Sequence, residues 1–75
     1  MPAPDPVLKK FGDNVRARRL AQDLSQEKLS ELAALDRTYI SGVERGVRNL
    51  SIKSAIRVAK ALGTTVGKLC EGIDR

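Results

Sequence analysis

Apolar residues recur along most of the chain about every three to four positions, the spacing that places them on one face of an α-helix. No stretch of useful length alternates with the period of two that a half-buried strand would show. Short polar or glycine-containing junctions divide the apolar pattern into five segments. The sequence therefore predicts an all-α fold, a compact bundle of five short helices.

The first two predicted helices are amphipathic. The first is expected between Val7 and Asp23, and Arg19 continues its apolar stripe, which consists of Leu8, Phe11 and Val15. The second is expected after Ser25, a favourable N-cap residue, and its apolar face consists of Leu29, Leu32 and Ala33. Residues 1–6 contain all three prolines and are expected to form a flexible arm, or a cap before the first helix, ahead of one domain at 7–75.

A third helix is expected between Asp36 and Gly46. Asp36 is a suitable N-cap whose charge favours the positive end of the helix, and Gly46 is a typical C-terminal stop. Ile40 and Val43 are expected to face inward. Gly42 interrupts the middle of this helix, where a glycine costs about 1 kcal/mol relative to alanine. Such a cost suggests that the missing side chain serves a purpose.

The last two predicted helices occupy the C-terminal third of the chain. The fourth is expected between the N-cap Ser51 and Gly63, with its apolar face formed by Ile52, Ala55, Ile56, Ala59 and Leu62. The fifth is short, and its apolar side consists of Val66, Leu69, Cys70 and Ile73.

The net charge of +5 is concentrated in one segment of this 75-residue chain. Residues 37–60 hold six arginines and lysines against the single acidic residue Glu44, so this segment accounts for the whole excess. A run of like charge is often no more than a solvated face. A basic excess of this kind also suits a polyanion, so a nucleic acid becomes a candidate partner.

The rare residue types exclude several classes of function. The chain has no histidine and a single cysteine, Cys70, which leaves no catalytic Cys–His dyad, no zinc cluster and no intrachain disulfide. No phosphate-cradling glycine motif is present either. We therefore expect a protein that is not an enzyme, with no cofactor, no metal and no small-molecule ligand. No apolar run is long enough to span a bilayer and no signal pattern opens the chain, so no membrane partner and a cytoplasmic location are expected.

The second and third predicted helices have the size of a helix-turn-helix, in which the second helix enters the major groove of DNA. Seven positions within residues 26–43 carry the apolar or small residues that this packing needs. They are Leu29, Ser30, Ala33, Ala34, Leu35, Ile40 and Val43. A plain helical hairpin would fix this spacing less tightly.

The stretch LSQEKLSELAALDRTYISGVERG resembles the helix-turn-helix of lambda repressor and Cro-type proteins. Within that superfamily, DRTYISGVERGVRNLSIKS in so short a chain is most similar to the controller proteins of restriction–modification systems. The resemblance implies a homodimeric transcription regulator that binds a palindromic operator in double-stranded DNA and times expression of its own gene and the endonuclease gene. Ala34 departs from the family pattern, which often has glycine in the turn; a left-handed alanine there would cost about 1 kcal/mol.

The exposed N-terminal part of the recognition helix is expected to read bases. The candidates are Arg37, Thr38, Ser41 and Gly42. Phosphate contacts are expected from the start of the second helix, from the loop after the third and, more weakly, from the first helix. These candidates are Gln26, Tyr39, Arg45, Arg48, Asn49, Ser51 and Arg16.

Two further sets of residues are expected to hold the assembly together. Family pairing predicts a partly buried ion pair between Arg19 and Glu44 that ties the first helix to the recognition helix. The dimer interface is predicted to consist of Leu50, Ile52, Val66, Leu69, Cys70 and Ile73. The alternative is that these residues only complete the monomer core, the role assigned to Ile56, Ala59 and Leu62.

Other regulators of this fold remain open at this level. A small repressor would have the same DNA-binding surface, and so would the antitoxin of a toxin–antitoxin pair, although no segment looks built to bind a toxin. RNA polymerase becomes a partner only if the protein activates transcription, and no residue pattern identifies such a contact. On DNA, the protein would be associated with the bacterial nucleoid.

Overall fold

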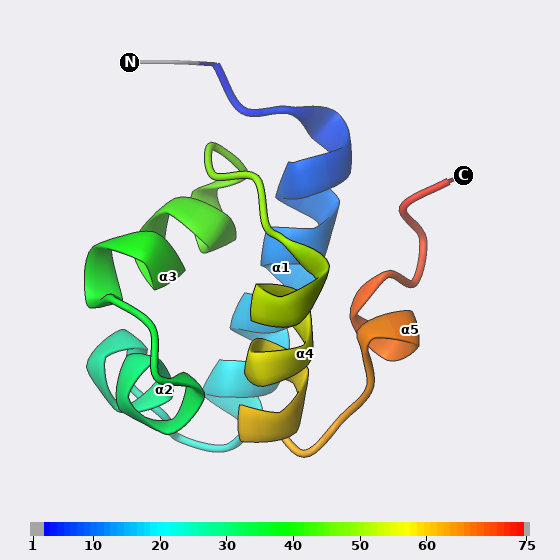
Figure 1. The fold of residues 1–75 in the computed structure, drawn as a ribbon. Helices are drawn as coiled ribbons and strands as arrows, with labels where there is room; N and C mark the ends of the chain where they lie inside the picture. The colour runs from blue at the N-terminus through cyan, green and yellow to red at the C-terminus, as the bar shows by residue number, and fades with distance from the viewer. Residues whose placement is uncertain (1–2, 75) are drawn as a thin grey trace.

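The computed structural model describes residues 3–74, and within that range it contains helices and no strand. The helices are α1 (Pro6–Ala21), α2 (Gln26–Ala33), α3 (Arg37–Arg45), α4 (Ile52–Ala61) and α5 (Val66–Leu69). This arrangement confirms the predicted all-α fold of five helices (Figure 1). None of these helices combines the length and the apolar character needed to cross a lipid bilayer.

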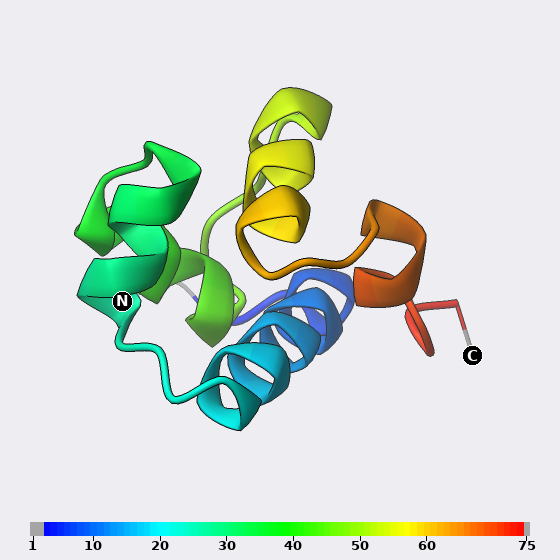
Figure 2. The ribbon, with the colours of Figure 1, turned by 90° about the horizontal axis from the view of Figure 1, so that it is seen from below.

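Helix α4 crosses in front of α1, and the other helices are distributed on the two sides of this pair (Figure 1). Helices α2 and α3 lie on one side and α5 lies on the other, as the view from below also shows (Figure 2). Helix α3, the predicted recognition helix, and the C-terminal helix α5 are therefore on different faces of the molecule.

Four helices begin where the sequence predicts a boundary or within one residue of it. Each of the four has an N-cap side chain that accepts a backbone hydrogen bond. Ser25, Asp36 and Ser51 accept hydrogen bonds from the backbone N–H groups of the first turns of α2, α3 and α4. Helix α1 begins at Pro6, one residue earlier than predicted, because the carboxylate of Asp5 accepts hydrogen bonds from the N–H groups of Val7 and Leu8. The capping residues thus fix the starts of the helices.

The segment ahead of α1 makes a specific contact with the end of α3. The N–H of Asp5 donates to the carbonyl oxygen of Gly46 at 3.0 Å. The first two residues of the predicted arm at 1–6 lie outside the described residues. Asp5 is therefore both the N-cap of α1 and a link to the loop that follows α3.

The core is formed by apolar side chains from all five helices. Those with no more than 1% of their surface exposed are Val15, Leu29, Ile40, Val43, Val58 and Leu69. Two core predictions were wrong: Leu32 is 52% exposed and Ile56 is 40% exposed. In α4, Val58 takes the inward position, because the buried face is centred on Ala55, Val58 and Ala59.

Helices α1 and α3 approach each other at Gly12. A Cβ atom on Gly12 would overlap the carbonyl oxygen of Val43 and would lie 2.8 Å from that of Glu44. Gly46 lies equally close to α1, since a Cβ added to it would lie 2.6 Å from the Cα of Lys9. The orientation of α3 relative to α1 is therefore fixed by contacts at the level of the backbone.

Among residues 3–74, two non-glycine residues have left-handed backbone conformations, and both are in turns. Ala34, between α2 and α3, has a φ of 56°, so the predicted turn keeps a left-handed residue at this position. Asp23, between α1 and α2, also has a φ of 56°, a value that the sequence pattern did not reveal. An alanine at such a position costs roughly 1–2 kcal/mol.

Candidate nucleic-acid interface

Helices α2 and α3 form a compact unit joined by residues 34–36. The N–H of Leu35 donates to the carbonyl oxygen of Ser30 at 2.9 Å, which closes the turn. On α3, Ile40 and Val43 are buried against the core, so the opposite face of the helix carries its polar residues outward. This unit presents one side of α3 to solvent.

Three of the four predicted base-reading residues lie on or beside this outward face. Arg37 and Thr38 are exposed, and Ser41 is half-buried. Arg37 has no hydrogen-bond or ion-pair partner among residues 3–74, so its guanidinium is available for a bidentate contact with guanine. The Thr38 hydroxyl donates to Asp36 at 2.8 Å, which leaves its methyl group and remaining lone pairs toward solvent.

The start of α3 is stabilised by the ionised carboxylate of Asp36. Hydrogen bonds from the side chain and the backbone N–H of Thr38 lower the pKa of Asp36 below its ordinary value. A lowered pKa means that the cap is present above the ordinary pKa of an aspartate and is lost as the pH falls through the lower, folded-state pKa. The first turn of the recognition helix is therefore fully capped at neutral pH.

Gly42 does not lie on the open side of α3, and its predicted role in base contact needs correction. It is buried, because the loop after α3 folds over it. A Cβ on Gly42 would lie 3.1 Å from the Cβ of Arg48 and 3.9 Å from Val47 Cγ2. The helix is thus covered at this point by protein, and no open surface remains there for a base.

One flank of α3 is formed by Tyr39 and the loop after the helix. The guanidinium carbon of Arg48 lies 5.2 Å from the centre of the Tyr39 ring, a cation–π contact. The Tyr39 hydroxyl donates to the carbonyl oxygen of Asn49 at 3.4 Å. The predicted phosphate contacts Tyr39, Arg48 and Asn49 are therefore brought together, with Ser51 next to them as the N-cap of α4.

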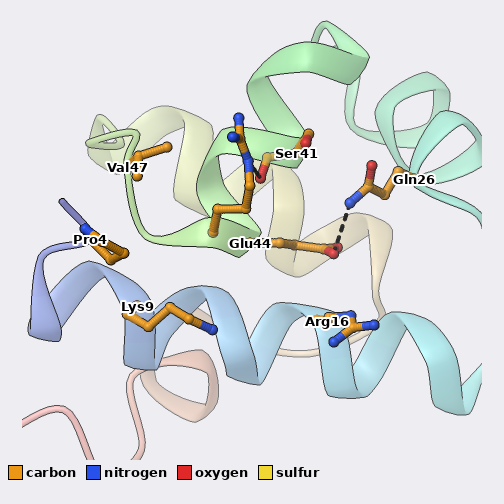
Figure 3. A pocket seen from close by; sticks show the side chains of 8 residues that line it. Pro4, Lys9, Arg16, Gln26, Ser41, Glu44 and Val47 are labelled. Atoms are coloured by element: carbon orange, nitrogen blue, oxygen red, sulfur yellow. Dashed lines mark hydrogen bonds between the residues drawn. The ribbon is translucent and has the colours of Figure 1, made fainter. Parts of the chain in front are cut away.

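The other flank is a cleft of about 620 Å³ between α1 and α3, which also includes the start of α2 (Figure 3). Lys9 and Arg16 extend into it from α1, and Gln26 enters from α2 (Figure 3). Arg45 lines the cleft from α3, and its Nε donates to the carbonyl oxygen of Ser41 at 3.3 Å. Lys9, which pairs with Asp13, is an addition that the sequence pattern did not single out.

Arg19 and Glu44 form a buried ion pair between α1 and α3. Arg19 Nε donates to Glu44 Oε2 at 2.7 Å and its second terminal nitrogen donates to Oε1 at 3.0 Å. The hydrogen bonds with Glu44 raise the pKa of Arg19, against the effect of burial. The Gln26 amide also donates to Glu44 Oε1, at 3.1 Å, so the same carboxylate orients a predicted phosphate contact (Figure 3).

The predicted dimer residues fall into two groups. Leu69 is fully buried in the monomer core, with 0% exposure, so its assignment to the interface was wrong. The others line an apolar groove of about 260 Å³ between the start of α1, the start of α4 and the C-terminal segment. They are Leu50, Ile52, Val66, Cys70 and Ile73. Ile52, at its rim, is 78% exposed.

A short α2, a tight turn and an α3 that presents arginine and hydroxyl side chains between two polar flanks define a helix-turn-helix protein. The chain belongs to the helix-turn-helix family, which matches residues 15–69. It is 51% identical over 59 residues to the control protein C.SmaI of Serratia marcescens, covering 79% of this chain and 70% of that protein.

Solved structures of restriction–modification controller proteins have the same fold. The controller C.AhdI of Aeromonas hydrophila has a TM-score of 0.81 and 47% identity, over 83% of this chain and 94% of that one. C.Esp1396I, solved as a tetramer with its natural 35-base-pair operator, has a TM-score of 0.79 and 38% identity, over 91% of this chain and 90% of that one. These relatives are regulatory proteins, and they support DNA-binding transcription regulation for this family member.

Proposed function

We propose that this protein is a sequence-specific transcription regulator that binds a palindromic operator as a homodimer and controls a restriction–modification system. Its own gene and the endonuclease gene would be the targets. The observation that carries the proposal is the exposed face of α3, with Arg37 and Thr38 available at the start of a well-capped recognition helix. The similarity to controller proteins, one of them solved on its operator, supports the choice of this class.

The two flanks of α3 suit the two phosphate strands that border a major groove. With α3 in the groove, Tyr39, Arg48 and Asn49 would contact one strand, and the cleft with Arg16, Gln26 and Arg45 would contact the other. Gln26 retains a second amide N–H beyond the one it gives to Glu44, and this group is free for a phosphate oxygen. Such contacts position the protein, whereas Arg37, Thr38 and Ser41 would supply the sequence information.

A second copy of the chain is the occupant that best fits the apolar groove. The residues that line the groove come from α1, α4, the loop before α4 and the C-terminal segment, and none belongs to α3, so filling it would leave both recognition helices free. A 75-residue chain also buries a limited share of its apolar surface alone. Two copies related by a two-fold axis would read half-sites about 34–36 Å apart.

The proposed function predicts selective binding to the DNA that directly precedes the protein's own coding sequence. We expect this duplex to be bound at least about a thousandfold more tightly than a shuffled duplex of the same composition. Fluorescence anisotropy at fixed salt, with both duplexes labelled at one end, measures the ratio. Equal affinity for the two duplexes would contradict sequence-specific regulation at this site, and footprinting of the preferred duplex would show whether the protected bases form two symmetric halves.

The proposed interface predicts that Ile52→Asn makes the protein monomeric. Ile52 is 78% exposed in the single chain, so the exchange removes apolar surface at the groove without disturbing the core. Sedimentation equilibrium at micromolar concentration should show a dimer for the unaltered chain and a monomer for Ile52→Asn. Leu32→Asn is the matched control, since Leu32 is also exposed but lies on α2 and away from the groove. If both variants stay dimeric, another surface forms the interface.

A further inference from the structure

Gly42 lies on the side of α3 that carries Tyr39, and it is buried there because Arg48 and Val47 cover it. An added Cβ would lie 3.1 Å from Arg48 Cβ and 3.8 Å from Arg48 Nε. The first of these distances is shorter than ordinary van der Waals contact between carbon atoms, so the stem of Arg48 would have to shift by a few tenths of an ångström. The Arg48 side chain therefore lies directly across the helix at the one position that has no side chain.

The backbone around this contact is fixed on both sides. Gly46 has a φ of 76° and ends α3, and the N–H of Val47 donates to the carbonyl oxygen of Gly42 at 3.0 Å. This hydrogen bond belongs to the helix-terminating turn, in which a left-handed glycine redirects the chain. The residue that follows is Arg48, so its Cα is held close to α3 and only its side-chain torsions remain to be set.

The far end of Arg48 is held by an aromatic ring. Its guanidinium carbon lies 5.2 Å from the centre of the Tyr39 ring, and the Tyr39 hydroxyl donates to Asn49. Tyr39 and Gly42 are three residues apart and therefore adjacent on the same side of α3. The stem of Arg48 rests on Gly42 and its charged end rests on Tyr39, so one side chain spans both.

We propose that Gly42 is a positioning residue for Arg48, which it allows to lie flat on α3 with its guanidinium set against Tyr39 for a phosphate contact. The inference rests on the proposed function for its DNA part. A long arginine that is already ordered loses less rotamer freedom on binding than one that must be immobilised. Gly42 thus contributes to affinity through Arg48, which requires no contact between Gly42 and a base.

The first test needs no DNA and uses Tyr39 as a reporter. The chain has one tyrosine and no tryptophan, so its intrinsic fluorescence comes from Tyr39 alone. In Gly42→Ala, the shift of the Arg48 stem should loosen its guanidinium from the Tyr39 ring, and acrylamide quenching of Tyr39 should increase toward the value found for Arg48→Ala. Circular dichroism should show unchanged helix content, since alanine favours a helix interior over glycine. Gly67→Ala is the matched control, because that helical glycine has only Thr65 Oγ1 nearby, at 3.9 Å.

The second test separates positioning from direct contact by a double-mutant cycle on a duplex of random sequence. Gly42→Ala is expected to weaken binding by up to about tenfold and to reduce the slope of log affinity against log salt by up to about 0.9, as Arg48→Ala does. In the Arg48→Ala background, Gly42→Ala should have no further effect.

Three results would overturn the proposal: unchanged Tyr39 quenching in Gly42→Ala, unchanged affinity and salt slope in that variant, or an undiminished loss of affinity in the Arg48→Ala background. The last of these would mean that Gly42 acts on the DNA itself. If the unaltered chain fails to bind any duplex, the proposed function fails, and the quenching experiment still decides whether Gly42 positions Arg48.

Discussion

Replacing Glu44 by glutamine should lower the free energy of unfolding by about 3–5 kcal/mol, a large part of the stability of so small a domain. Arg19 and Glu44 are 7% and 4% exposed, so the exchange leaves a buried guanidinium without its counter-charge. The remaining acceptors for Arg19 would be the amide oxygen of the new glutamine and the carbonyl oxygen of Leu24, at 2.8 Å, and neither carries a full charge. A buried cation of this kind is costly whatever the neutral group beside it.

The same exchange should also disturb the DNA-binding surface. Glu44 accepts from both Arg19 and Gln26, and it belongs to α3, so it connects α1, α2 and the recognition helix. Loss of its charge weakens the hydrogen bond that holds the Gln26 amide, and the start of α2 becomes less well ordered. We therefore expect weaker DNA binding even at temperatures where the variant remains folded.

Urea denaturation followed by circular dichroism measures the effect on stability. Glu31→Gln is the matched control, since it makes the same chemical change in an exposed pair, 3.8 Å from Lys28, that is worth little. The expected result is a large shift in the denaturation midpoint for Glu44→Gln and almost none for Glu31→Gln. Equal midpoints for the two variants would show that the buried pair does not hold α1 to α3.

Arg37→Ala should abolish most of the preference for the operator while leaving binding to random DNA nearly intact. A bidentate contact between arginine and guanine is worth about 1–3 kcal/mol of discrimination, and the proposed dimer would make it twice, so about 2–6 kcal/mol is at stake. Arg37 is exposed at the first position of α3, so its removal leaves the core unchanged. The loss should therefore appear in the ratio of specific to random binding and hardly in stability.

Competition between the preferred duplex and the shuffled duplex gives this ratio directly. Arg57→Ala is a suitable control, because Arg57 is also an exposed helical arginine but lies on α4. It removes the same charge, and we expect the ratio to stay unchanged. If Arg37→Ala weakens binding to both duplexes by the same factor, Arg37 contacts phosphate and the assignment of base reading to it is wrong.

Local chemistry made most of the helix boundaries predictable from the sequence. Ser25, Asp36 and Ser51 cap helices as expected, because a side chain that accepts a backbone N–H acts within two or three residues. The inward face of α4 was less predictable. The apolar residues of α4 lie on more than one face of that helix, so periodicity alone could not decide whether Ile56 or Val58 is in the core.

The features that could not be predicted from the sequence depend on contacts between segments that are distant in the chain. Gly12 gives no local signal, and only the packing of α1 on α3 explains it. Gly42 was conspicuous in the sequence, but its burial depends on a loop that folds back over the helix. Leu69 was assigned to the dimer interface together with Val66 and Cys70, because all three belong to the apolar side of the predicted fifth helix. Val66 and Cys70 line the groove, whereas Leu69 is fully buried in the monomer core.

Because α1 and α3 approach each other closely at Gly12, the inner face of α3 cannot change during evolution, whereas its outer face can. Any larger residue at position 12 would tilt α3 as a whole, and every contact of its outer face would shift together. Exchanges at Arg37, Thr38 or Ser41 leave that packing untouched, since these side chains are outside the core. A descendant of this protein could thus acquire a new operator by substitutions on one face of a single helix, without rebuilding the framework that holds it.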